Sequence, residues 1–83
     1  MKYIIVKYYE MDLEHPMLFD EMIEHAVIYR QLGKPILVSA GFVHYDDTLA
    51  DDFKMYCTGQ SKALKTESHS GDIDIIKRTL NRW

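Results

Sequence analysis

One run of residues restricts the fold of this chain more than any other. Residues 2–9 read KYIIVKYY, so β-branched and aromatic side chains follow one another with little alternation between apolar and polar types. This pattern predicts a strand, and it is typical of a strand that is buried on both faces. The chain has 83 residues, which suffice for a single domain over residues 1–83 and are too few for two.

The segment that follows predicts a helix over residues 16–32. Pro16 suits the first position of a helix, and Gly33 followed by Pro35 suits its end. At about 100° per residue, one narrow arc of this helix is apolar and holds Leu18, Met22, Tyr29 and Leu32. We therefore expect the helix to pack on the sheet through that arc.

Two further strands are expected to pair as an antiparallel hairpin. Residues 36–45 form the first, and Gly41 within it indicates a bulge or a close approach of another backbone segment. Residues 53–58 form the second because apolar and polar side chains alternate along them. The acidic segment 46–52 would be the loop between the two strands.

A polar connector over residues 59–71 leads to a last helix, expected over residues 71–82. Ser70 is the expected N-cap of this helix. Its apolar side chains repeat with helical spacing: Ile73, Ile76, Leu80 and Trp83. The element order β-α-β-β-α predicts an α+β fold in two layers, with both helices packed on one face of a small, mostly antiparallel sheet.

The composition narrows the class of protein. Ten basic and thirteen acidic residues give a net charge of −3, which argues against nucleic-acid binding. No run of residues approaches the length of a membrane span, so no membrane association is expected. Cys57 is the single cysteine, which excludes an internal disulfide and points to a cytoplasmic protein. The thin core of so small a domain leaves apolar surface that a homodimer could bury.

His15 is the first candidate for chemistry. It precedes Pro16 and would lie at the start of the helix expected over 16–32. The helix dipole disfavours the charged imidazolium there, so a neutral ring could act as a base or a nucleophile. The alternative is an exposed loop histidine without a role.

The segment 59–65, GQSKALK, is the second candidate. One glycine, one serine and two lysines could form a pocket for an oxyanion, since successive backbone N–H groups can bind an anion. The alternative is a solvated loop. Other polar residues indicate no metal or cofactor site: the aspartates of the acidic loop lack the order of a calcium loop, the histidines lack the spacing of metal ligands, and Cys57 is expected to be a core residue. The aspartates concerned are Asp46, Asp47, Asp51 and Asp52.

The order of elements and four short motifs resemble the janus/ocnus family, whose fold is that of protein phosphohistidine phosphatase. The motifs are Lys2-Tyr3-Ile4-Ile5-Val6, His15-Pro16-Met17-Leu18-Phe19-Asp20, Gly41-Phe42-Val43-His44 and Tyr56-Cys57-Thr58-Gly59-Gln60-Ser61-Lys62-Ala63. The chain departs from the family in its shorter length, in Pro16 after the histidine, and in Phe42 where the family has an arginine. The last departure removes one positive charge from any phosphate site.

The resemblance implies a phosphate-binding domain that hydrolyses a phosphorylated side chain without a metal or organic cofactor. His15 would be the catalytic imidazole. The phosphate-binding residues would be Lys2, Gly59, Ser61, Lys62 and Ala63. The ligand would be a phosphorylated protein or a small phosphate compound.

A second hypothesis needs no catalysis. The chain would be a homodimeric interaction module or a ligand-binding module, with the acidic segment 10–24 as a recognition surface for a basic partner. Both hypotheses place the chain in the same fold class and differ in what the fold does.

Overall fold

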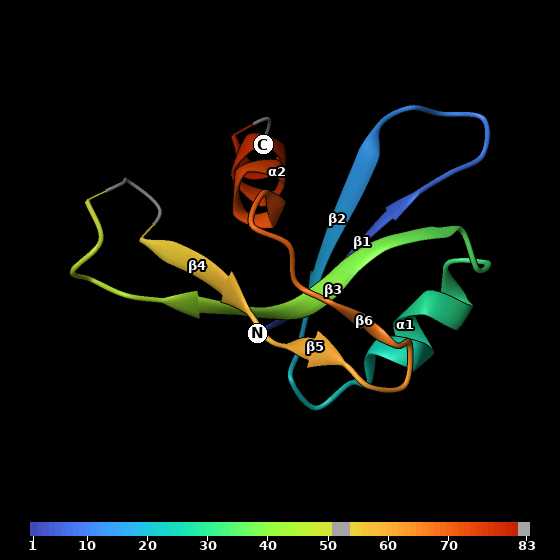
Figure 1. Cartoon of the computed structure of the whole chain (residues 1–83), viewed down its shortest axis with the longest axis horizontal. Helices are drawn as coiled ribbons and strands as arrows, with labels where there is room; N and C mark the ends of the chain where they lie inside the picture. Colours follow the sequence, from blue (N-terminus) through green and yellow to red (C-terminus); the bar gives the residue numbers. More distant parts are fainter. Residues whose placement is uncertain (51–53, 82–83) are drawn as a thin grey trace.

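The computed structural model of the protein describes residues 1–50 and 54–81 (Figure 1). Its elements in chain order are β1 (Lys2–Lys7), β2 (Glu14–Phe19), α1 (His25–Gln31), β3 (Ile36–Tyr45), β4 (Met55–Thr58), β5 (Gln60–Ser61), β6 (Thr66–Glu67) and α2 (Asp72–Leu80). The expectations for Asp51, Asp52, Phe53 and Trp83 fall on positions outside the described residues.

The centre of the fold is an antiparallel sheet of four strands in the order β2-β1-β3-β4. Strand β1 therefore pairs on both edges. Residues 3–6 are at most 2% exposed, so both faces of β1 are covered as well. The short strands β5 and β6 pair with each other in a separate hairpin, which extends along β3 past the end of β4.

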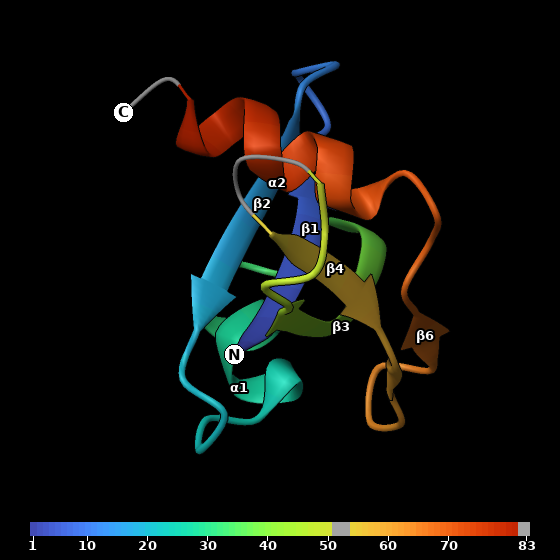
Figure 2. The same cartoon turned by 90° about the vertical axis from the view of Figure 1, so that its left-hand side faces the viewer.

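The two faces of β1 carry two separate apolar clusters. Tyr3 and Ile5 pack with Ile76 of α2, whereas Ile4 and Val6 belong to the cluster that includes residues of α1. The predicted α+β fold, with a mostly antiparallel sheet and two helices packed on it, is confirmed. The helices lie on opposite faces of the sheet instead of one face (Figure 2), because a strand that is apolar on both faces needs cover on both.

The prediction of a helix over residues 16–32 is wrong for its first half. Residues 14–19 form β2, and α1 begins only at His25. A turn separates the two elements: the Asp20 side chain accepts the backbone N–H of Met22 at 2.7 Å, and the Asp20 carbonyl accepts that of Ile23 at 3.0 Å. Met22, expected on the buried arc, is 90% exposed.

The remaining elements agree more closely with the sequence. Strand β3 has the predicted bounds, and α2 occupies most of the predicted last helix. The N-cap of α2 is Gly71 and not Ser70. Gly41 is a point of close approach, since a Cβ atom there would lie 2.5 Å from the carbonyl oxygen of Thr58. The bulge in the β1–β3 pairing lies elsewhere, at Ile5 and Val6.

A buried carboxylate fastens α2 to the central strand. Asp72 is 1% exposed. Its side chain accepts a hydrogen bond from the Tyr3 hydroxyl and a second one, at 2.8 Å, from the backbone N–H of His69. Burial first, and then the hydrogen bond to Asp72, raises the pKa of Tyr3 far above its ordinary value of 10.0. Burial raises the pKa of Cys57, which packs against the same cluster, from 9.0 to about 11.

These raised pKa values predict a loss of stability in alkaline solution. The unfolded chain releases protons from Cys57 and Tyr3 near their ordinary pKa values of 9.0 and 10.0, whereas the folded chain holds them to higher pH. The stabilisation is therefore complete below pH 9 and decreases as the pH rises above it, by up to about 1.4 kcal/mol per pH unit for each group.

Urea unfolding between pH 7 and about 11 measures this loss. In the variant Tyr3→Phe, the free energy of unfolding should fall less steeply above pH 10 than in the parent. Tyr9→Phe is the control, because Tyr9 is 83% exposed and lies outside the core. Equal slopes for Tyr3→Phe and the parent would show that the Tyr3 hydroxyl does not hold its proton through this contact.

Candidate functional site

The structure places His15 at the second position of strand β2 and not at the start of a helix. It lies in β2 directly opposite Val6 of β1. Its ring packs edge-on against Tyr8 with 5.6 Å between the ring centroids. The Nε2 atom is buried and has no hydrogen-bond partner. Because no helix begins beside it, the reason for expecting a dipole-tuned neutral imidazole is removed.

The segment 59–65, the second candidate from the sequence, lies in the β5–β6 hairpin. Ser61 is 4% exposed, and its hydroxyl accepts the backbone N–H of Leu64 at 3.4 Å. The Lys62 carbonyl accepts the N–H of Lys65 at 3.3 Å. Leu64 packs into the apolar cluster on the α1 face and anchors the hairpin there. The hydroxyl of Ser61 thus stabilises the turn, and the two lysines are left exposed beside it.

An open hollow of about 530 Å³ lies on this hairpin. Lys62, Lys65 and His69 contribute its basic groups, and Glu67 contributes its acid. The remaining lining residues, Gln60, Ser61 and Thr66, are polar and uncharged. Two lysines against one carboxylate leave a net positive charge, which suits a small anion. Exposed lysines in water bind an anion weakly, because solvent and salt screen the attraction.

Only part of the predicted phosphate site reaches this hollow. Of the residues described, the lining contains Ser61 and Lys62 and leaves out Lys2, Gly59 and Ala63. The Lys2 ammonium donates instead to the carbonyl of Ile23, at 2.9 Å. Gly59 has a φ of +86° and packs against Phe42, the residue opposite Lys2 on the neighbouring strand.

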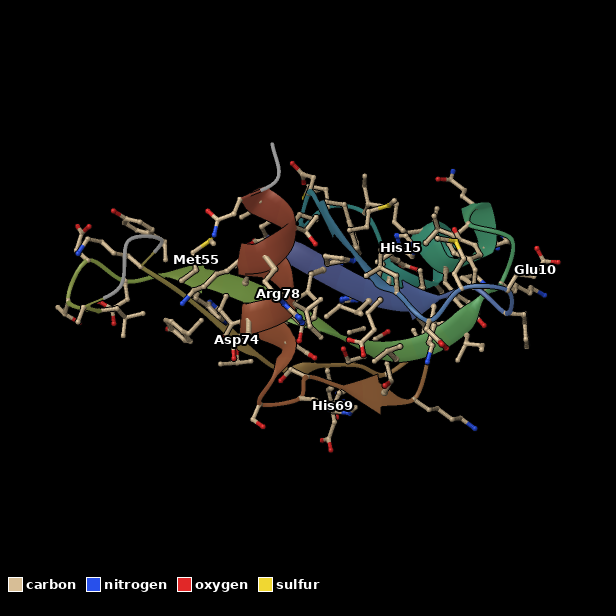
Figure 3. All side chains as sticks on the ribbon, turned by 90° about the horizontal axis from the view of Figure 1, so that it is seen from above. Glu10, His15, Met55, His69, Asp74 and Arg78 are labelled. Carbon is tan, nitrogen blue, oxygen red and sulfur yellow. The ribbon has the colours of Figure 1, made fainter. Side chains whose placement is uncertain are left out.

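His15 is separated from the hairpin by the width of two strands. Strands β1 and β3 lie between β2 and the hairpin, which is a lateral distance of at least about 10 Å. Figure 3 shows His15 and His69 on opposite sides of these strands. The imidazole that the resemblance implies as catalytic therefore does not meet the residues that it implies for phosphate binding.

A row of aromatic rings along the α1 side of the sheet was not predicted. Neighbouring rings lie within 4.9–6.5 Å of each other between centroids. In order the row is Phe19, His25, Phe42, His44 and Tyr56. The ring of His25 is buried and donates from Nε2 to the Gly41 carbonyl at 2.9 Å. His25 is therefore a core histidine with a structural partner.

One pair in this row joins a base to a hydroxyl. His44 Nε2 and the Thr58 hydroxyl are hydrogen-bonded at 2.6 Å, on paired strands β3 and β4. A hydroxyl and an imidazole at this distance are two parts of a nucleophilic site, which also needs a group that stabilises the developing charge. Alternation along β3 could have indicated that Phe42 and His44 share a face, but the register to Thr58 appears only in the fold.

Other kinds of site are not found in the described part of the chain. Among residues 1–50 and 54–81, no group of three or more His, Cys, Asp or Glu side chains is placed to hold a metal ion. No helix within these residues is long and apolar enough to cross a membrane. No family model, no curated protein and no solved structure matches the chain.

The position of the hairpin depends on Gly59, which yields a prediction. An alanine in place of Gly59 would have to adopt a positive φ, and its Cβ would lie 2.7 Å from the ring of Phe42. An alanine in place of Gly33 would have to adopt a similar φ of +83°, but its Cβ would have no atom within 4 Å. Gly59→Ala should therefore lower the free energy of unfolding by about 1–3 kcal/mol more than Gly33→Ala, the usual cost of overpacking.

Urea unfolding of the two variants beside the parent measures this difference. The comparison isolates the contact with Phe42, because both substitutions carry the same backbone strain. An equal loss in the two variants would mean that Phe42 does not hold the hairpin at Gly59.

Proposed function

We propose that the protein is a ligand-binding module that takes a phosphate group at the β5–β6 hairpin. The observation that carries the proposal is the convergence of Lys62, Lys65 and His69 on one hollow, with the side chains of Gln60 and Thr66 beside them. The lysines supply charge, and the amide and hydroxyl supply neutral hydrogen-bond donors, as a phosphate oxygen requires. The ligand is a phosphorylated side chain or a small phosphate compound.

The proposal contains no hydrolysis step. Transfer of a phosphoryl group needs a nucleophile or a base within reach of the bound phosphorus. His15, the residue implied for this role, lies two strands away from the hollow. His69 lines the hollow, but it is an exposed residue in the segment between β6 and α2. Binding without turnover is the function that this arrangement supports.

Amide shifts of the isotope-labelled protein during titration with sodium phosphate test the proposal, with sodium chloride of equal ionic strength as the reference. Saturable shifts should be confined to residues 60–69, with a dissociation constant of about 1 mM or weaker. The double variant Lys62→Gln/Lys65→Gln should weaken binding by about fivefold or more.

A matched control separates the site from the general effect of charge. Arg30→Gln/Lys34→Gln removes the same two charges from exposed positions on and after α1. Lys34 even shares the unusual backbone of Lys65, with φ values of 53° and 54°. This control and His15→Ala should leave phosphate affinity unchanged. Equal weakening by both double variants, or loss of binding in His15→Ala, would contradict the proposal.

A further inference from the structure

The β5–β6 hairpin packs against the protein through one face and turns its charged side chains outward. Ser61 is buried, and Leu64 belongs to the apolar cluster on the α1 face. Side chains alternate between the two faces of a strand, so the neighbours of the packed residues lie on the outer face. The exposed residues, which all line the hollow, are Gln60, Lys62, Lys65, Glu67 and His69.

The charges on this outer face are sorted along the hairpin. Lys62 and Lys65 lie at the two ends of the turn, where the Lys65 N–H donates to the Lys62 carbonyl at 3.3 Å. Glu67 lies beyond the turn, directly opposite Gln60. A step of two residues, about 7 Å along a strand, separates the lysines from the carboxylate. The hollow is therefore cationic at the turn and anionic one step toward the base of the hairpin.

The carboxylate of Glu67 and the ammonium groups of Lys62 and Lys65 are available to a ligand. All three residues are exposed. Within residues 1–50 and 54–81, no hydrogen bond or ion pair engages their side chains. A phosphate alone is attracted by the lysines and repelled by Glu67. A ligand that carries a cation beside its phosphate meets the opposite charge at both ends.

We infer that the hairpin takes a phosphate compound that also carries an ammonium or guanidinium group. Its phosphate lies at Lys62 and Lys65, and its cation lies at Glu67. The inference rests on the proposed phosphate site and specifies the class of its ligand. Complementary charges of this kind add specificity more than affinity, so the expected gain is that of a single exposed ion pair.

Two compounds that differ only in the amine, aminobutyl phosphate and butyl phosphate, provide the comparison. Amide shifts measure both dissociation constants at a pH of about 8, where imidazoles are neutral and the phosphate is a dianion. Aminobutyl phosphate should bind about two- to fivefold more tightly. If the lysines alone decided affinity, the larger negative charge of butyl phosphate would give the opposite order. The amine should also add shifts at Gln60 and Glu67.

The variant Glu67→Gln assigns the preference to this carboxylate. It should abolish the advantage of aminobutyl phosphate and raise the affinity for butyl phosphate, because a repulsion is removed. The control Glu10→Gln removes the same charge from an exposed position between β1 and β2. It should leave the ratio of the two dissociation constants unchanged. Circular dichroism of both variants verifies that the fold is retained.

A pair of peptides distinguishes a phosphorylated protein from a small phosphate compound as the source of this chemistry. Each contains phosphoserine, followed two positions later by lysine in one peptide and by glutamine in the other. Side chains two residues apart in an extended peptide lie on the same side, about 7 Å apart, so the lysine peptide should bind more tightly than its counterpart. Tighter binding of the lysine peptide than of aminobutyl phosphate identifies a protein source, and weaker binding identifies a small compound.

The inference and the phosphate site fail in different ways. Equal or tighter binding of butyl phosphate, or a preference for the amine that survives in Glu67→Gln, would overturn the inference and leave the phosphate site intact. If butyl phosphate and inorganic phosphate both give no saturable shifts, the phosphate site itself is wrong, and the inference is wrong with it.

Discussion

The fold depends on β1 being apolar on both faces. Residues 3–6 are at most 2% exposed. Each Å² of apolar surface that they remove from water contributes about 25 cal/mol to the stability of the fold. A strand of this kind requires pairing on both edges and cover on both faces. Strands β2 and β3 supply the pairing, and α1 and α2 supply the cover. The bond between Tyr3 and Asp72 then fixes α2 on its face, because the carboxylate is buried and needs its donors.

This arrangement also separates the hairpin proposed to bind phosphate from the strand that carries His15. The hairpin with Lys62 and Lys65 contacts β3, on one side of β1. Strand β2, which carries His15, lies on the other side. The acidic segment of the sequence is divided between the two ends of β2: Glu10, Asp12 and Glu14 precede or begin β2, whereas Glu21 lies past its other end and holds the N-terminal ammonium at 2.7 Å. The central position of β1 therefore separates the hairpin from the strand that carries His15.

The sequence was a good guide where the local pattern and the fold demanded the same structure. Strand β3 and the buried character of β1 could be predicted from their runs of β-branched and aromatic residues, and the last helix from its helical period. Residues 16–22 fit both a helical pattern and a strand pattern. Leu18 and Met22 fit a helical arc, but Leu18 and Phe19 also fit opposite faces of a strand, and β1 needed a partner on its open edge. Pairing in the sheet prevailed over the helical pattern, and Met22 was left in solvent.

The candidate site could be predicted only in part for the same reason. Lys62 and Ser61 are neighbours in the chain, so their common location on one hairpin followed from the sequence. The location of His15 depended on whether residues 14–19 form a strand, and that depended on contacts with β1. The pair of His44 and Thr58 depends on the register of two strands, which no local pattern specifies.

The separation of His15 from the hairpin is the central claim of this account, and it rests on β2 being a strand. Nuclear Overhauser spectra of the unmodified protein test it most directly. The α protons of Ile5 and Pro16 face each other across a pair that exchanges no hydrogen bonds, and such protons lie close together in antiparallel sheets. The account predicts a strong cross-peak between them. Sequential amide contacts running from residue 17 to residue 32, without that cross-peak, would show a continuous helix and contradict it.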